Sequence, residues 1–204
     1  MSAGQRHAGG RPRAFDEERA LDGATEVFWR LGYEGASLAE LTNAMGINKP
    51  SLYAVYGSKE ELFVRALQRY GESYHEHLRE LLAHPRAYDV IESYLRATAK
   101  SVRAGTLPGC LSIQGGLSCA PNNARIPQLL ADYRRGIENA VEKALAATED
   151  ASHLDVAALA GYAVTIGQGL AVDAAAGVPQ ARLDAVVEVA LAGLAVSMDR
   201  PAAR

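Results

Sequence analysis

The segment between residues 37 and 63 constrains this chain more than any other, because it carries the start and stop signals of three successive helices. Ser37 followed by Glu40 forms a capping box, which marks a helix N-terminus, and Ser58 begins a second box of the same type. Gly46 predicts the left-handed residue that ends the first helix. Two short helices joined by a glycine-containing turn form a helix-turn-helix, whose second helix can enter the major groove of DNA.

The second helix of this unit divides into an inner and an outer face. We expect it to begin at Asn48 or Lys49, with Pro50 in its first turn, where a missing backbone N–H costs little. Leu52 and Tyr56 are four residues apart and are expected to anchor the helix inward.

The outer face of this helix is expected to meet the DNA. Polar side chains can hydrogen-bond base edges or phosphates, and a tyrosine can also touch a thymine methyl group. The groove-facing candidates are Lys49, Ser51 and Tyr53. Ser37 and Lys59 begin the flanking helices, where backbone N–H groups favour a phosphate. The alternative for Ser37 is that it only caps its helix and makes no contact with DNA.

The composition limits the fold and the class of protein. With 204 residues, 49% of them hydrophobic, the chain can bury a sizeable core. Strand-like alternation is absent, so we predict an all-α fold of about nine helices. No run of about 18 apolar residues and no secretory signal are visible, which predicts neither a membrane span nor export. The two cysteines suit a reducing compartment, and a cytoplasmic location is expected.

The charge distribution shows how an acidic chain can bind DNA. The net charge is -3, whereas affinity for phosphates comes mainly from lysine and arginine. Residues 1–13 contain Arg6, Arg11 and Arg13 and no acid. We expect a flexible basic arm over residues 1–14, with Arg11 and Arg13 contacting DNA. The alternative is a disordered, solubilising tail.

Hydrophobic periodicity predicts the other helices. One is expected to start near Asp16 and to end at Gly32. The helix-turn-helix at about 37–56 is followed by expected helices at 59–83, 87–104, 125–147, 153–176 and 180–198. Residues 106–124 are rich in glycine and proline and predict a broken helix.

The last two predicted helices each carry a broad apolar stripe. A short Gly-Val-Pro turn joins them, an arrangement that suits a helix pair packing against its own copy. We therefore predict a homodimer through residues 153–176 and 180–198. The alternative is that both stripes only fill the core of the monomer.

The stretch GYEGASLAELTNAMGINKPSLYAVYGSKEELF, residues 32–63, resembles the N-terminal domain of the TetR (tetracycline-repressor) family. Its landmarks are Gly-Tyr at 32–33, Leu-Ala at 38–39, Met-Gly-Ile at 45–47, Leu-Tyr at 52–53 and Ser-Lys-Glu at 58–60, with GRPRAFD at 10–16 and VFW at 27–29 typical of a large subgroup. The likeness covers about a quarter of the chain. It departs from the family pattern at Tyr56-Gly57, where the aromatic anchor is kept.

The resemblance implies a homodimer whose N-terminal helices read a near-palindromic, double-stranded operator. The body would bind a small molecule that lowers operator affinity, and repression is the majority behaviour. On this basis we divide the chain into the arm at 1–14, a helix-turn-helix domain at 15–62 and an effector-binding and dimerisation domain at 63–204. The positions that match the family's DNA contacts are Ser37, Asn48, Lys49, Pro50, Ser51, Tyr53, Tyr56 and Lys59.

The same resemblance places an effector pocket among the long helices of the body. The side chains that could line it are Tyr70, Tyr74, Tyr94, Tyr133, Tyr162 and Gln168. Each tyrosine is equally compatible with packing in the core. Several similar regulators place a thiol that senses electrophiles or oxidants at the position of Cys110, although a free cysteine is usually a small buried hydrophobe. Cys110 joins the pocket candidates, and a thiol-sensing regulator is the alternative function.

Other chemistry finds little support in the sequence. His77, Glu80 and His84 share a helix face without an accompanying cysteine, and we predict neither a metal site nor a cofactor. No GxSxG, HExxH, P-loop or GxGxxG signature occurs, so an enzyme is not expected. A small helical enzyme without a signature and a DNA-binding protein without an effector remain as alternatives.

Overall fold

The chain is a series of helices, described by a computed structural model for residues 16–103, 109–116 and 124–198, with the side chains of 73–77 excepted. The helices are α1 (Glu17–Gly35), α2 (Leu38–Met45), α3 (Lys49–Tyr56), α4 (Lys59–Leu81), α5 (Ala87–Ser101), α6 (Leu111–Gln114), α7 (Arg125–Ala146), α8 (Val156–Ala175) and α9 (Gln180–Met198), with a 3-10 turn at Ala151–His153. Within these ranges there is no strand, and the all-α prediction is confirmed.

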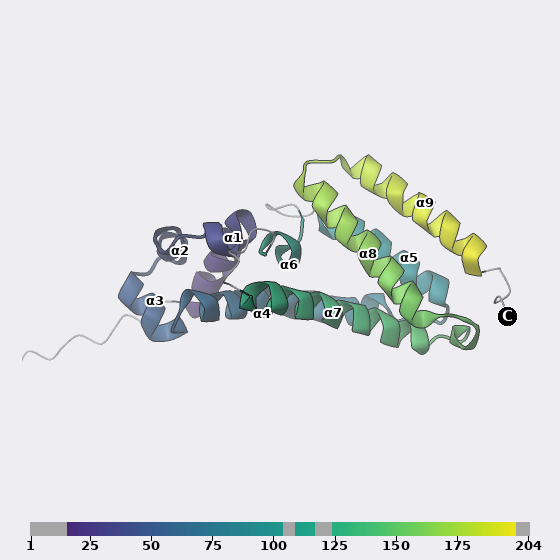
Figure 1. Ribbon diagram of the computed structural model, residues 1–204, viewed down its shortest axis with the longest axis horizontal. Helices are drawn as coiled ribbons and strands as arrows, with labels where there is room; N and C mark the ends of the chain where they lie inside the picture. The colour runs from purple at the N-terminus through teal and green to yellow at the C-terminus, as the bar shows by residue number, and fades with distance from the viewer. Residues whose placement is uncertain (1–15, 104–108, 117–123, 199–204) are drawn as a thin grey trace, which may run out of the picture.

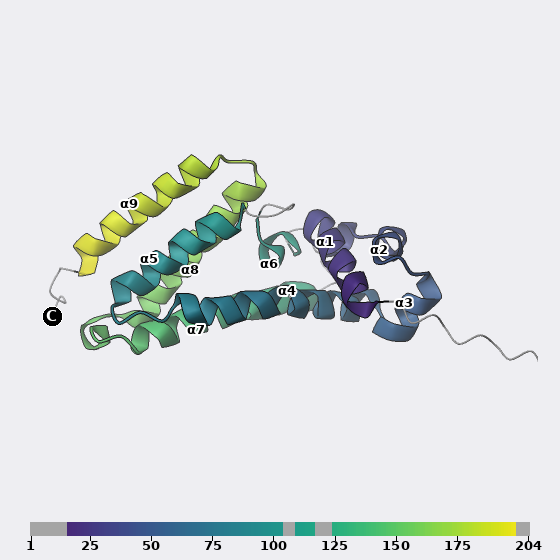
Figure 2. The same ribbon diagram turned by 180° about the vertical axis from the view of Figure 1, so that it is seen from behind.

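The molecule is elongated, with two groups of helices at opposite ends (Figure 1). We call α1, α2 and α3 the head, and α5, α7, α8 and α9 the body. The helix α4 begins beside α3 and extends into the body, where it lies along α7 (Figure 2). The short α6 lies between the two groups and contacts α1, α4, α7 and α8. A change in the body can therefore reach the head through α4 or α6.

Two hydrophobic clusters correspond to the two ends. The cluster of the head is centred on Phe28, Leu41 and Leu52, and it also takes in α4 as far as Leu67. It recruits Leu111, Ile126 and Leu130 from α6 and α7. The first turns of α4 therefore pack with the head. The division of the chain into two domains at residue 63 stays a prediction.

Local signals set the helix boundaries of the head. Ser37 and Glu40 form the predicted capping box, and Gly46 ends α2 with a φ of 66°. The N–H of Glu61 donates to Ser58 Oγ (3.0 Å) at the start of α4. Gly57, where the sequence departs from the TetR pattern, has a φ of 75° and ends α3. A side chain at that position would be strained, so glycine suits this corner.

The end of α1 differs from the prediction. Gly32 interrupts the helix with a φ of 69°, but α1 continues for another turn to Gly35. The N–H of Ala36 donates to the carbonyl of Gly32 (3.2 Å), which closes that extra turn. The break also turns the N–H of Tyr33 toward α6, where it donates to the carbonyl of Gly115 (3.0 Å). The glycine thus links α1 to α6.

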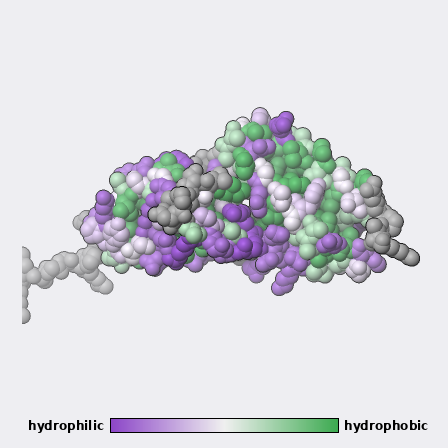
Figure 3. Space-filling view, in the orientation of Figure 1, coloured by the Kyte–Doolittle hydropathy of each residue, from purple (hydrophilic) through white to green (hydrophobic). Residues whose placement is uncertain are grey.

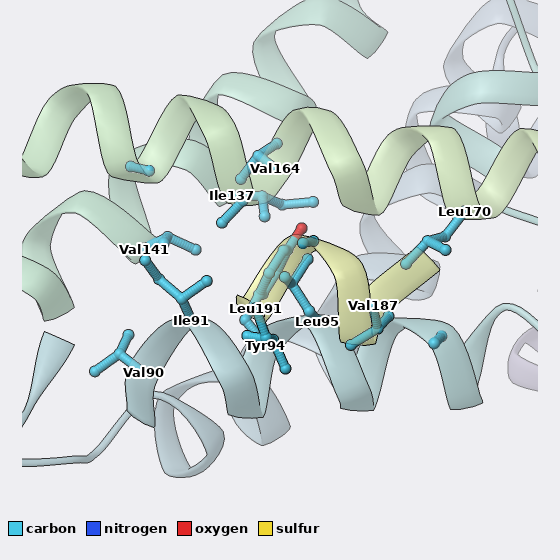
Figure 4. Close-up of a cluster of buried hydrophobic side chains, with 14 of the residues drawn as sticks. Val90, Ile91, Tyr94, Leu95, Ile137, Val141, Val164, Leu170, Val187 and Leu191 are labelled. Carbon is cyan, nitrogen blue, oxygen red and sulfur yellow. The ribbon is translucent and has the colours of Figure 1, made fainter. Parts of the chain in front are cut away.

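The core of the body lies among α5, α7, α8 and α9 (Figure 4). Ile91 and Leu95 on α5 meet side chains such as Val141, Val164 and Leu191 from the other three helices. By length and composition alone, α8 could cross a membrane, with a mean hydropathy of 1.3. A core helix passes the same test, and seven residues of α8 are buried here.

Candidate functional site

The helix α3 presents its polar end and one tyrosine to the outside of the head. Leu52 is fully buried and anchors the helix, while Tyr53 is 47% exposed. Asn48, Lys49 and Pro50 are exposed, and Ser51 is half-buried. The helix thus buries Leu52 and exposes Tyr53, as the sequence predicted.

Tyr56 takes the inner position and is not available for a side-chain contact with DNA. It is 3% exposed, and its hydroxyl donates to the carbonyl of Glu17 (3.4 Å). Burial raises the pKa of Tyr56, and the nearby Glu17 carboxylate raises it further. The expectation that Tyr56 contacts DNA conflicts with this burial, because the ring is needed to anchor α3 on α1.

Two candidate phosphate contacts act as helix caps. Ser37 Oγ accepts the N–H of Glu40 (3.2 Å) and donates to its carboxylate (2.7 Å). The Glu40 carboxylate accepts this hydroxyl bond and also the N–H of Ser37 (3.0 Å), and these two hydrogen bonds lower the pKa of Glu40. Asn48 Oδ1 accepts the N–H of Ser51 (2.9 Å). Both side chains are exposed, so a cap and a phosphate contact remain compatible at each position.

Lys59 joins α4 to α1. Its Nζ lies 4.6 Å from the centre of the Tyr33 ring, a cation–π contact. Burial lowers the pKa of Lys59, while the charge of Glu34 raises it. Arg69 adds a second link from α4 through Asp22 (3.1 Å). Arg11 and Arg13, the candidates in the basic arm, lie outside the described residues.

A cavity of about 630 Å³ lies on the side of the body that faces the head; among its described lining residues Trp29 comes from α1 and the others from the chain between Tyr70 and Ala171. This volume is in the range of small-molecule sites. Five predicted pocket residues line it: Tyr70, Tyr94, Cys110, Tyr133 and Gln168. Tyr74 belongs to the side chains that are not described. Tyr162 does not line the cavity, because it lies between α8 and α9 and its hydroxyl donates to the carbonyl of Ala190 (2.9 Å).

Polar contacts gather at the end of the cavity next to α6. The Tyr70 hydroxyl donates to Cys110 Sγ (3.4 Å), and Cys110 Sγ lies 3.1 Å from Ser112 Oγ. The Tyr70 ring meets Trp29 edge to face, with centres 5.0 Å apart. Arg134 on α7 donates to the carbonyl of Ser112.

Sequence reasoning missed Trp29 and Arg134 as cavity residues. The aromatic run at 27–29 was visible, but only the packing of α1 on α4 brings Trp29 to the cavity. Arg134 follows Tyr133 in an ordinary helical pattern, and nothing local distinguishes it from the exposed Arg135. Among the described residues, no three of His, Cys, Asp and Glu are placed to hold a metal ion.

Comparisons with known proteins agree with this geometry. The model of the family "Bacterial regulatory proteins, tetR family" matches residues 20–66. The transcriptional repressor ComR of Escherichia coli (strain K12) is 32% identical over 188 residues, which cover 89% of this chain and 88% of ComR. The repressor BdcR of the same strain is 36% identical over 108 residues, 52% of this chain and 55% of BdcR.

A solved structure of the TetR-family regulator CifR has the same fold. This cysteine mutant of CifR, bound to a 26-base-pair double-strand operator, is 40% identical, with a TM-score of 0.84 over 89% of this chain and 98% of CifR. The helix-turn-helix in the head, the helical body and these relatives together define this protein as a DNA-binding transcriptional regulator. The chain belongs to the TetR family.

Proposed function

We propose that the protein is a cytoplasmic repressor that binds a palindromic operator as a homodimer and leaves it when a small molecule fills the cavity. The observation that carries this proposal is the exposed face of α3, with Lys49 and Tyr53 outward and Leu52 buried beneath. Lys49, Ser51 and Tyr53 are the base-edge and phosphate candidates. Ser37, Asn48, Pro50 and the α4 N-terminus at Lys59 supply positioning contacts, and Arg11 and Arg13 add backbone affinity.

The proposed dimer uses α8 and α9. Exposed apolar side chains gather on these helices (Figure 3), and they are Val172, Val186, Val189 and Val196. Val189 is 74% exposed, and a group of exposed apolar side chains of this kind is typical of a protein–protein contact surface. A two-fold partner would place the two α3 helices in grooves about one helical turn, roughly 34–36 Å, apart. Val189→Glu is expected to yield monomers in sedimentation and to weaken operator binding.

Two physical links could carry a signal from the cavity to the head. Tyr70 and Leu78 on α4 line the cavity, and α4 begins beside α3. The second link is α6, whose Gly115 carbonyl holds the N–H of Tyr33 on α1 (3.0 Å). An effector must bind the DNA-incompetent arrangement better, and a 10- to 100-fold release needs only about 1.4–2.7 kcal/mol of coupling.

The test begins with selection of a binding site from random double-stranded DNA, using the full-length protein. The proposal predicts a near-palindromic site, bound with strong salt dependence. A selected pool with no symmetry, or affinity that does not change with salt, contradicts it.

A second candidate function is thiol sensing through Cys110, favoured by the Tyr70 hydroxyl that donates to Sγ (3.4 Å). Cys110 lines the cavity, so an electrophile that enters the cavity can reach this sulfur. N-ethylmaleimide would form an S–C bond, and the thiol proton would end on the neighbouring ring carbon. Alkylation is expected to release the operator from the wild type and from the control Cys119→Ser, but not from Cys110→Ser. Release from all three proteins would remove this candidate.

A further inference from the structure

The cavity has a cluster of polar contacts at the end next to α6, and apolar side chains of α4 line it further along. Arg134 marks the polar end, since it donates to the carbonyl of Ser112 on α6. Trp29 lies at the same end, because Tyr70 contacts both the Trp29 ring and Cys110. Leu78 and Leu81 line the cavity two to three turns further along α4, about 12–16 Å from Tyr70. An occupant of matching shape has a polar head and an apolar tail.

The charged side chains among the described lining residues of the cavity are both positive. Arg134 and Lys100 line the cavity, and no aspartate or glutamate is among its described lining residues. In the described part of the chain, no carboxylate lies within ion-pairing distance of Arg134. An unpaired guanidinium beside an apolar chamber favours an anionic ligand, because arginine matches a carboxylate with two parallel hydrogen bonds.

A buried donor at the same end gives independent support. Trp29 Nε1 is buried and has no hydrogen-bond acceptor among the described residues. Buried donors are satisfied in most structures, and leaving one unpaired costs about 1–3 kcal/mol. A ligand that brings an acceptor oxygen would remove that cost, whereas a ligand that brings only donors would not.

We propose that the effector is an organic monoanion, with one carboxylate held by Arg134 and an apolar body lying against Tyr70 and Leu78. This inference rests on the proposed function, in which the cavity is the effector site. The faces of Trp29, Tyr70 and Tyr133 favour an aromatic body close to the carboxylate.

The pairing of the ligand carboxylate with Arg134 also explains how the ligand would release the protein from DNA. A carboxylate competes with the Ser112 carbonyl for the Arg134 guanidinium, and the charged acceptor makes the stronger hydrogen bond. The α6 helix then loses this hydrogen bond to α7. Because Gly115 at the end of α6 holds Tyr33 of α1, the anion favours a different placement of the head. Neutral or cationic ligands lack this effect.

The test uses Trp29, the single tryptophan of the chain, as a fluorescent reporter in the full-length protein. Three probes of similar shape differ in charge: phenylpropionate, phenylpropionamide and phenylpropylamine. A longer set, octanoate with its amide and amine, checks the apolar length. At least one carboxylate is expected to bind about tenfold or more tightly than its amide, with the amine weakest.

Arg134→Gln is expected to bring the carboxylate down to the affinity of its amide, and Arg134→Lys to give an intermediate value. The matched control is Arg135→Gln, because Arg135 is the next residue, exposed, and paired with Asp132 outside the cavity. Circular dichroism and melting confirm that each variant is folded.

Three results would overturn the anion inference: equal or tighter binding of the amide or amine, a carboxylate preference that survives in Arg134→Gln, or no binding by either carboxylate. Operator release by a neutral probe would do the same while leaving the proposed function intact. Failure of the ligand-free protein to bind any specific DNA site would instead overturn the proposed function itself, whatever the probes do.

Discussion

The head and the body of this protein are specified in different ways. In the head, short helices begin at side-chain caps such as Ser37 and Asn48 and end at glycines with positive φ. In the body, long helices rich in alanine and glycine enclose a cavity, and its shape depends on contacts between residues far apart in the chain. The head presents an exposed surface on short helices, whereas the body holds a chamber lined by side chains from several long helices. Substitutions at exposed positions of the head should therefore change DNA binding without disturbing the packing of the body.

The largest expected effect that separates the two regions comes from Tyr53→Ala. The ring is 47% exposed on α3, so its loss removes a DNA contact without opening the core. Operator affinity should fall 10- to 100-fold, about 1–3 kcal/mol, while the free energy of unfolding changes by less than about 0.5 kcal/mol. Anisotropy with the selected operator measures the first quantity and urea titration the second. Tyr53→Phe then tells whether the ring or the hydroxyl makes the contact.

Gly167→Ala should perturb the body alone. An added Cβ would lie 3.0 Å from the Tyr94 hydroxyl, at the cavity wall, whereas at Gly136 on α7 it would meet nothing within 4 Å. Gly136→Ala should stabilise its helix by about 0.5–1 kcal/mol, and Gly167→Ala should cost about 1–3 kcal/mol through overpacking. Urea titrations of the two variants give the comparison. Equal stabilisation by both would show that the wall beside Tyr94 is loose.

A smaller effect is expected from Ser37→Ala. Loss of this N-cap should cost about 1 kcal/mol, confined to the head, because the capping hydrogen bonds stay within α2. Hydrogen exchange should speed up at the amides of α2 and stay unchanged in α5 and α8. Equal acceleration in α8 would mean that head and body unfold as one unit.

The smallest effect concerns pH. Hydrogen bonds from Ser37, first from its side chain and then from its backbone, hold the pKa of Glu40 below its usual 4.5. A lowered carboxylate pKa stabilises the fold above the unfolded-state pKa, and that contribution is lost as the pH falls through the folded-state value. Protection of the α2 amides should decline below pH 4.5 in the wild type but not in Glu40→Gln. If protection of the α2 amides declined equally in both proteins, a group other than Glu40 would be responsible for the acid sensitivity.

The sequence predicts more of the structure of the head than of the cavity in the body, and the reason is physical. The capping box at Ser37, the left-handed Gly46 and the inward Leu52 follow from local rules, and each was predicted correctly. The helices of the body were also predictable from their period, whereas the cavity position of Tyr70 was predicted from the family resemblance. The cavity position of Trp29, the contact of Arg134 with α6 and the turn of Tyr162 toward α9 depend on how helices pack, which no local pattern encodes. The extra turn after Gly32 depends on a single long-range arrangement of α1 and α6.

The most direct test of the account compares two lysines that differ only in where they lie. Lys49 is exposed at the start of α3, and Lys143 is exposed on α7 in the body. Operator affinity is measured by anisotropy over a series of salt concentrations for the wild type, Lys49→Ala and Lys143→Ala. If α3 reads DNA, Lys49→Ala should lower affinity about tenfold or more and reduce the salt slope by about one, while Lys143→Ala matches the wild type. Identical behaviour of the two variants would contradict the claim that α3 reads DNA.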